Sequence, residues 1–236
     1  MELKSTAKIN IGLHVHNKRK DGFHNISTIF QEINFFDVIN ITEAKNFSCK
    51  TNIKQIKEED NFATKAFHLI KTKFPIIPNV SISIKKNIPT NAGLGGGSSN
   101  GTTVLKGLNE LFDLSLKDDD LANFAREVSS DSTFFVEGGL QLGQQRGEKL
   151  TPITGSTLPN HILLIHPNIK ISTKDAFNQL KNHLLNENMD INLSNLLKEL
   201  KNNNFNSKLF KNDFEMYVFK THPEIGKIKY NLMDLG

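Results

Sequence analysis

Hydrophobic and polar positions alternate at the start of the chain. Within residues 5–16, the apolar side chains from Ile9 to Val15 share one face and polar side chains share the other. Residues 26–42 have the pattern of a further strand, with an apolar run around residues 33–41, and residues 80–85 alternate again. These patterns predict three β-strands.

Apolar residues recur at helical spacing in other segments. They do so after Asp60-Asn61 and again in residues 117–127, where three aspartates begin the segment and favour a helix N-terminus. Further helices are predicted over residues 100–112, 173–186, 193–202 and 225–235, and further strands over residues 134–143 and 161–166. Because strands and helices mix without strict βαβ alternation, we expect an α+β fold. We expect one domain over residues 1–154 and a second over residues 155–236.

Composition narrows the class of protein. The 236 residues carry a net charge of only +4, with no long basic block, so we expect no nucleic-acid partner. A single cysteine excludes a disulfide framework within the chain, the N-terminus is too polar for a signal peptide, and no apolar run has membrane-spanning length. We expect a cytoplasmic protein, a monomer or weak homodimer, that acts on a small molecule and contacts no membrane.

A glycine-rich loop separates the predicted strand 80–85 from the predicted helix 100–112. Glycines let backbone N–H groups approach an anion closely, and the helix N-terminus adds unpaired N–H donors. This order therefore predicts a phosphate-binding loop. The residues of the loop are Pro89, Thr90, Asn91, Ala92, Gly93, Leu94, Gly95, Gly96, Gly97, Ser98 and Ser99.

Three other interpretations of the loop fit less well. The Walker A loop requires a lysine after its last glycine, and none follows here. The dinucleotide fingerprint fits only with Ser98 in place of its third glycine. A flexible Gly/Ser linker is the ordinary alternative, but the flanking Pro89, Leu94 and helix pattern favour an anion site.

The loop resembles the phosphate loop of the GHMP kinase superfamily. Further segments resemble that family in the same order, among them Ala-Lys-Ile-Asn at residues 7–10, Asp-Gly-Phe-His at residues 21–24 and the segment around Asp131. The resemblance implies a two-domain GHMP kinase fold, with a ribosomal-protein-S5-like N-terminal domain and a ferredoxin-like C-terminal domain. The family usually continues beyond Gly236, so the second domain is expected to be incomplete.

The same resemblance implies an ATP-dependent small-molecule kinase. The Gly-Leu-Gly-Gly-Gly-Ser-Ser form at residues 93–99 resembles the branch that phosphorylates the 2-hydroxyl of a cytidylyl methylerythritol in the non-mevalonate isoprenoid pathway. ATP and Mg²⁺ are the implied cofactors. A kinase of homoserine or mevalonate type, or a truncated non-catalytic nucleotide-binding homologue, remains an alternative.

Lys8 and Asp131 are the candidate catalytic residues. A kinase acting on an alcohol needs a group to accept or orient the hydroxyl proton, and a carboxylate suits that role. By resemblance Asp131 is that base, with the Lys8 ammonium beside it. A turn aspartate and an exposed strand lysine are the ordinary alternatives. Ser130, Ser132 and Thr133 depart from the family pattern, which puts the backbone of this loop in question.

The resemblance also implies residues for the substrate. The Phe23 ring stacks on the cytosine in place of the more usual tyrosine, and His24 hydrogen-bonds its polar edge. Phe177 stacks on the opposite face of the base, unless it is only a core residue of its predicted helix. Asn10 holds the polyol-phosphate end.

Candidates around the nucleotide are Asn61, Lys65 and Lys86, besides the glycine loop. Asn61 is alternatively only a helix N-cap, and Lys86 a solvated lysine. Ser98, or alternatively Ser99, is the candidate Mg²⁺ ligand, because serines at a helix start contact the metal in related phosphate loops.

Overall fold

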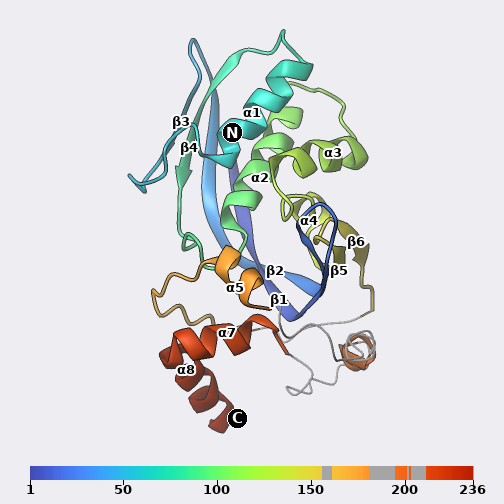
Figure 1. The fold of residues 1–236 in the computed structure, drawn as a ribbon. Helices are drawn as coiled ribbons and strands as arrows, with labels where there is room; N and C mark the ends of the chain where they lie inside the picture. Colours follow the sequence, from blue (N-terminus) through green and yellow to red (C-terminus); the bar gives the residue numbers. More distant parts are fainter. Residues whose placement is uncertain (156–160, 181–194, 201, 203–210, 236) are drawn as a thin grey trace. The chain divides into compact units, whose positions relative to one another are not determined.

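The computed structural model of this chain describes residues 1–155, 161–180, 195–200, 202 and 211–235. Its strands form one mixed sheet in the order β3-β4-β2-β5-β6, and β1 pairs with β2 (Figure 1). β4 runs antiparallel to β2 and parallel to β3. The strands are β1 (Glu2–Lys18), β2 (His24–Ala44), β3 (Ser48–Thr51), β4 (Asn79–Lys85), β5 (Leu140–Gln145) and β6 (Lys149–Pro152).

The chain divides into two compact units. The first contains residues 1–9 and 30–141, and the second contains residues 10–29 and 142–236. Strands β1, β2 and β5 contribute residues to both units, so the division crosses the chain more than once. The predicted single boundary after residue 154 stays a prediction.

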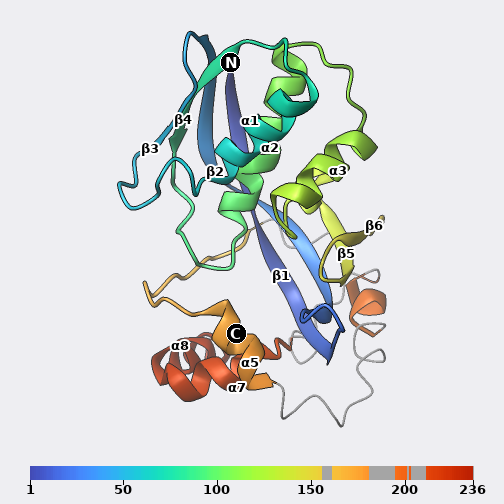
Figure 2. The same cartoon turned by 45° about the horizontal axis from the view of Figure 1, so that its top comes forward.

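In the first unit, helices pack on one face of the sheet (Figures 1 and 2). The core lies between them, with β-branched side chains from β2 and β4 packed against apolar side chains of the helices. Asn61 caps the first helix, as its sequence pattern predicts. The helices are α1 (Phe62–Lys73), α2 (Gly96–Leu111), α3 (Asp118–Val128) and α4 (Phe134–Glu137).

Two predicted boundaries in this unit are wrong. Helix α2 begins at Gly96 rather than at residue 100, so its first turn belongs to the glycine loop. The segment 134–143 is not one strand but α4 followed by β5, because Gly138 and Gly139 both take positive φ values, 70° and 72°, and separate the two elements. Short apolar runs do not distinguish a buried helix from a buried strand.

After β6, the regular structure in the described part of the second unit is helical. It holds α5 (Thr173–Leu180), a helical stretch at residues 195–200, α7 (Phe214–Thr221) and α8 (Pro223–Asp234). The predicted helices over residues 173–186 and 193–202 lie partly outside the described residues. The predicted ferredoxin-like arrangement of this part stays a prediction.

The predicted strand at residues 161–166 is wrong. These residues have no regular structure, and Leu163 in their middle is 79% exposed. A strand needs a neighbour for its backbone hydrogen bonds, and no strand among the described residues pairs with this segment. None of the described helices is both long and apolar enough to span a bilayer.

Candidate active site

The glycine loop is attached to β1 in the first unit. The Lys8 N–H donates to the Leu94 carbonyl at 2.9 Å, and Leu94 packs with Ala7 and Ile88 in a small apolar cluster. Gly95 takes a φ of 70°, and an added Cβ would lie 2.9 Å from the Phe135 ring and 3.1 Å from the Lys8 side chain. Both the conformation and the close approach therefore require glycine here.

The loop ends at the first turn of α2, which starts at Gly96. The first N–H groups of a helix have no intrahelical partner and favour an anion, assisted by the helix dipole. In this way the loop and the helix start together provide the donors that a phosphate chain needs.

Lys8 and Asp131 are brought together beside this loop. Lys8 Nζ lies 3.5 Å from Asp131 Oδ2, and their side chains are 6% and 38% exposed. The ammonium also lies 5.2 Å from the centre of the Phe30 ring. The lysine is thus buried and held in place, while the carboxylate keeps access to a ligand.

Ser132, one of the residues that depart from the family pattern, belongs to a hydroxyl network next to Asp131. Ser129 Oγ donates to Ser98 Oγ at 2.8 Å and lies 2.7 Å from Ser132 Oγ, and Ser132 Oγ donates to the Ser98 carbonyl at 3.2 Å. Thr102 Oγ1 donates to the Ser132 carbonyl at 2.7 Å. These bonds connect the aspartate loop to the first turns of α2. Ser98 Oγ accepts from Ser129 and so has its own proton free to donate.

Lys86 lies under the loop in a buried polar network. Its ammonium pairs with Asp37, which is fully buried, and donates to Asn100 Oδ1 at 2.8 Å. Asn100 Nδ2 reaches Asp37 Oδ2 at 2.9 Å and Ser5 Oγ at 2.8 Å, and Ser5 Oγ donates to Ser99 Oγ at 2.8 Å. This geometry gives Lys86 a supporting position behind the loop, and its predicted contact with the nucleotide stays a prediction.

The other two nucleotide candidates also make local contacts. Asn61 Oδ1 accepts from the Ala63 N–H at 2.9 Å and caps α1. Lys65 Nζ donates to the Val128 carbonyl at 3.2 Å, which connects α1 to the end of α3. Asn61 thus acts as a helix N-cap, the ordinary alternative for this residue. That Asn61 and Lys65 also contact the nucleotide stays a prediction.

The predicted substrate residues lie in the second unit. The His24 and Phe177 rings stack with centroids 5.3 Å apart and planes 14° apart, so no third ring fits between them. Phe23 is 53% exposed, and the Arg146 guanidinium lies 4.9 Å from the centre of its ring. Asn10 Nδ2 donates to Thr28 Oγ1 at 2.9 Å. Phe23 therefore offers an accessible aromatic face, whereas Phe177 covers the ring of His24.

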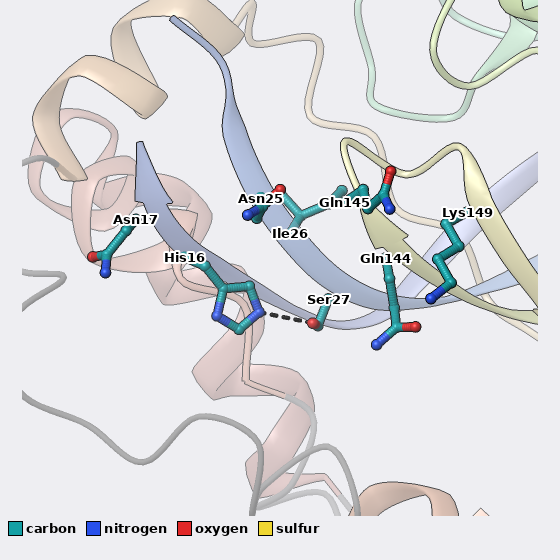
Figure 3. Close-up of a pocket in the computed structure, with 8 residues that line it drawn as sticks. All are labelled: His16, Asn17, Asn25, Ile26, Ser27, Gln144, Gln145 and Lys149. Atoms are coloured by element: carbon teal, nitrogen blue, oxygen red, sulfur yellow. Dashed lines mark hydrogen bonds between the residues drawn. The ribbon is translucent and has the colours of Figure 1, made fainter. Parts of the chain in front are cut away.

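A separate polar pocket of about 390 Å³ opens on the same unit (Figure 3). Among its lining residues, His16 Nε2 lies 2.7 Å from Ser27 Oγ, and Lys149 supplies a charged group. No predicted site residue lines this pocket. Its lining residues are His16, Asn17, Asn25, Ile26, Ser27, Gln144, Gln145 and Lys149.

Sequence reasoning missed several residues that shape the site. Asp37 is a lone acid inside an otherwise apolar strand segment, which is itself a signal of a buried partner. Arg146 precedes a glycine in a turn, and nothing in the sequence around it indicates a functional contact. Among the described residues, no group of three or more His, Cys, Asp or Glu side chains gathers as a metal site.

Comparison with known proteins identifies the family and the relatives of this chain. The family model described as GHMP kinases N terminal domain matches residues 61–139. The 4-diphosphocytidyl-2-C-methyl-D-erythritol kinase of Clostridioides difficile (strain 630) is 37% identical over 238 residues, covering 99% of this chain and 80% of that protein. The protein of the same name from Sulfurihydrogenibium sp. (strain YO3AOP1) is 40% identical over 191 residues, covering 81% of this chain and 69% of that protein.

Solved structures show the same fold. A crystal structure of 4-(cytidine 5'-diphospho)-2C-methyl-D-erythritol kinase matches with a TM-score of 0.79 at 24% identity, covering 100% of this chain and 84% of that one. The Methanococcus jannaschii mevalonate kinase matches with a TM-score of 0.59 at 16% identity, covering 97% and 79%.

The matching family model and relatives at 37% and 40% identity make this protein a GHMP kinase, and its α+β fold and glycine loop are consistent with that class. A relative that is 37% identical over 99% of this chain shows which branch of the GHMP kinases it belongs to. The chain belongs to the family of 4-diphosphocytidyl-2-C-methyl-D-erythritol kinases. The resemblance expected from the sequence and the predicted GHMP kinase fold are thereby confirmed.

Proposed function

We propose that this protein transfers the γ-phosphoryl group of ATP to the 2-hydroxyl of 4-diphosphocytidyl-2-C-methyl-D-erythritol. The new bond joins the substrate oxygen to the γ-phosphorus, and the bond from that phosphorus to the β–γ bridging oxygen breaks. ADP and the 2-phosphate are the products. The observation that carries this proposal is the Lys8–Asp131 pair at 3.5 Å beside an intact glycine loop.

Asp131 accepts the proton of the substrate hydroxyl in this proposal. Its carboxylate is 38% exposed and therefore reachable, and the buried Lys8 ammonium fixes its orientation. The same ammonium places positive charge where the transferring group becomes more negative. Phosphoryl transfer depends mainly on positioning and charge stabilisation, which this pair supplies.

The nucleotide phosphates bind at the glycine loop and the first turn of α2. Ser98 fits the role of a Mg²⁺ ligand or of a hydrogen-bond donor to a phosphate oxygen. Its hydroxyl lies at the start of α2 and has a proton free to donate. When bound, Mg²⁺ neutralises charge on the phosphate oxygens. Asn61 and Lys65 border the nucleotide, and Lys86 supports the loop through Asp37 and Asn100.

The second unit recognises the cytidylyl part of the substrate. Phe23 supplies an exposed ring for stacking, and His24 supplies polar atoms for the base edge. Phe177 stacks on the opposite face of the base in this proposal, and its ring also stacks on that of His24. Asn10 faces the polyol-phosphate end.

The test is ADP release by the purified chain with three separate acceptors. We expect turnover with 4-diphosphocytidyl-2-C-methyl-D-erythritol and none above background with homoserine or mevalonate. Turnover with another acceptor alone would assign the chain to a different kinase activity. ATP binding without turnover on any acceptor would identify a non-catalytic homologue.

A further inference from the structure

Phe23 lies at the end of a tightly braced turn. Arg19 N–H donates to the Phe23 carbonyl at 2.7 Å, and the Phe23 N–H donates to Asp21 Oδ1 at 3.1 Å. Arg19 Nε also donates to Asp21 Oδ2 at 3.0 Å. The backbone that carries the ring is therefore fixed, and only the side-chain torsions of Phe23 are left to orient the ring.

Arg146 comes from a second braced turn, between β5 and β6. The Gly147 N–H donates to the Gln144 carbonyl at 3.0 Å, and the Arg146 N–H donates to Glu148 Oε2 at 2.7 Å. Arg146 Nε lies 3.5 Å from Glu148 Oε1, so the guanidinium is held at its own turn. The turn thus presents a planar cation in a set direction.

The two turns meet where the guanidinium lies 4.9 Å from the centre of the Phe23 ring. Desolvation acts to raise the pKa of the Asp21 carboxyl, yet the net shift is downward. The groups that lower this pKa are, in order of effect, the Phe23 N–H, Arg19 and Arg146. Arg146 thus interacts with the carboxylates of Asp21 and Glu148 while its guanidinium lies over the Phe23 ring.

We propose that Arg146 is a positioning residue for the cytosine site: by covering one face of Phe23, it holds the ring and leaves the other face for the base. This inference rests on the proposed function of Phe23. An aromatic ring with 53% exposure and no contact on either face would rotate between rotamers, and ordering it would cost binding free energy. The guanidinium removes that cost before the substrate arrives.

The test is calorimetric titration of the whole chain with cytidine 5'-diphosphate. We expect Arg146→Ala to raise the Kd by roughly three- to ten-fold, as for loss of one cation–π contact, and to leave kcat unchanged at saturating substrate. Arg146→Lys should recover part of the affinity. Arg126→Ala removes an exposed arginine of α3 and should leave the Kd unchanged.

A double variant separates positioning from direct charge attraction. In a Phe23→Leu background, Arg146→Ala should cause no further rise in Kd, because the ring through which it acts is gone. An equal rise in both backgrounds would overturn the proposal, since Arg146 would then attract the diphosphate directly. If Phe23→Leu raises the Kd but Arg146→Ala does not, the positioning role of Arg146 is overturned, while the proposed cytosine site at Phe23 stands. If Phe23→Leu itself leaves the Kd unchanged, the proposed cytosine site fails, and this inference fails with it.

Discussion

Lys8 Nζ lies 3.5 Å from Asp131 Oδ2, although the lysine belongs to the first strand and the aspartate to the loop before α4. The same lysine donates its backbone N–H to Leu94 in the glycine loop. One residue therefore holds the phosphate loop with its main chain and the proposed base with its side chain. A small displacement of β1 would disturb both at once.

Asp131→Asn should abolish most turnover while leaving ATP binding in place. The amide keeps the shape of the side chain but cannot accept the hydroxyl proton, and loss of a general base typically costs about 10²- to 10⁴-fold in rate. ADP release measures turnover, and calorimetry measures ATP binding. Asp119→Asn, at an exposed position of α3, is the matched control. Undiminished turnover would remove Asp131 from the proposed role.

Gly95→Ala should lower the free energy of unfolding and raise the KM for ATP. The left-handed backbone costs a non-glycine residue about 1–2 kcal/mol, and contact of the new methyl with Phe135 and Lys8 adds about 1–3 kcal/mol. Gly139→Ala is the control, because Gly139 has a φ of 72° but open space around a Cβ. Urea denaturation measures both variants. Equal losses would show that the close approach at Gly95 carries no cost.

Lys86→Met should destabilise the protein by about 3–5 kcal/mol, because it leaves the Asp37 carboxylate buried without its cation. The double variant with Asp37→Asn should lose less than the sum of the two single variants, since the residues form one network. Lys50→Met removes an exposed lysine of β3 and should change stability little. A loss of ATP affinity without a loss of stability would instead favour direct contact of Lys86 with the nucleotide.

Cys49 makes the stability of the first unit depend on pH in the alkaline range. Its side chain is 4% exposed, and burial raises the pKa of the thiol to about 11. The unfolded thiol titrates near pH 8.5, so between these two values the folded state holds more protons than the unfolded state. Stability contributed by the thiol is therefore complete below about pH 8.5 and is lost as the pH rises toward 11.

The measurement is urea denaturation of the parent chain and of Cys49→Ala across that range. The difference between their free energies of unfolding should shrink with rising pH, by at most about 1.4 kcal/mol per pH unit. Comparing the two proteins cancels the titration of lysines and tyrosines. A difference that does not change with pH would contradict the raised pKa.

Local patterns predicted much of the first unit. Alternation marked β1 and β4, and the Asp60-Asn61 pair marked the start of α1, because side-chain periodicity and capping depend on neighbours in the chain. The segment 134–143 was predicted wrongly as a strand, since its apolar run suits either structure and the two glycines after it decide where the helix stops. A strand was also predicted wrongly at the exposed segment 161–166, whose strong local pattern has no pairing strand among the described residues.

The sequence by itself determined that a glycine loop precedes a helix and that the chain resembles a kinase family. It also identified Lys8 and Asp131 as candidate catalytic residues. Only the tertiary structure decided that Lys86 pairs with Asp37 behind the loop and that Arg146 covers Phe23. Glycine conformation and helix capping act within a few residues, so sequence carries them. Ion pairs and ring contacts join residues far apart in the chain, and their partners are chosen by how the strands and turns pack.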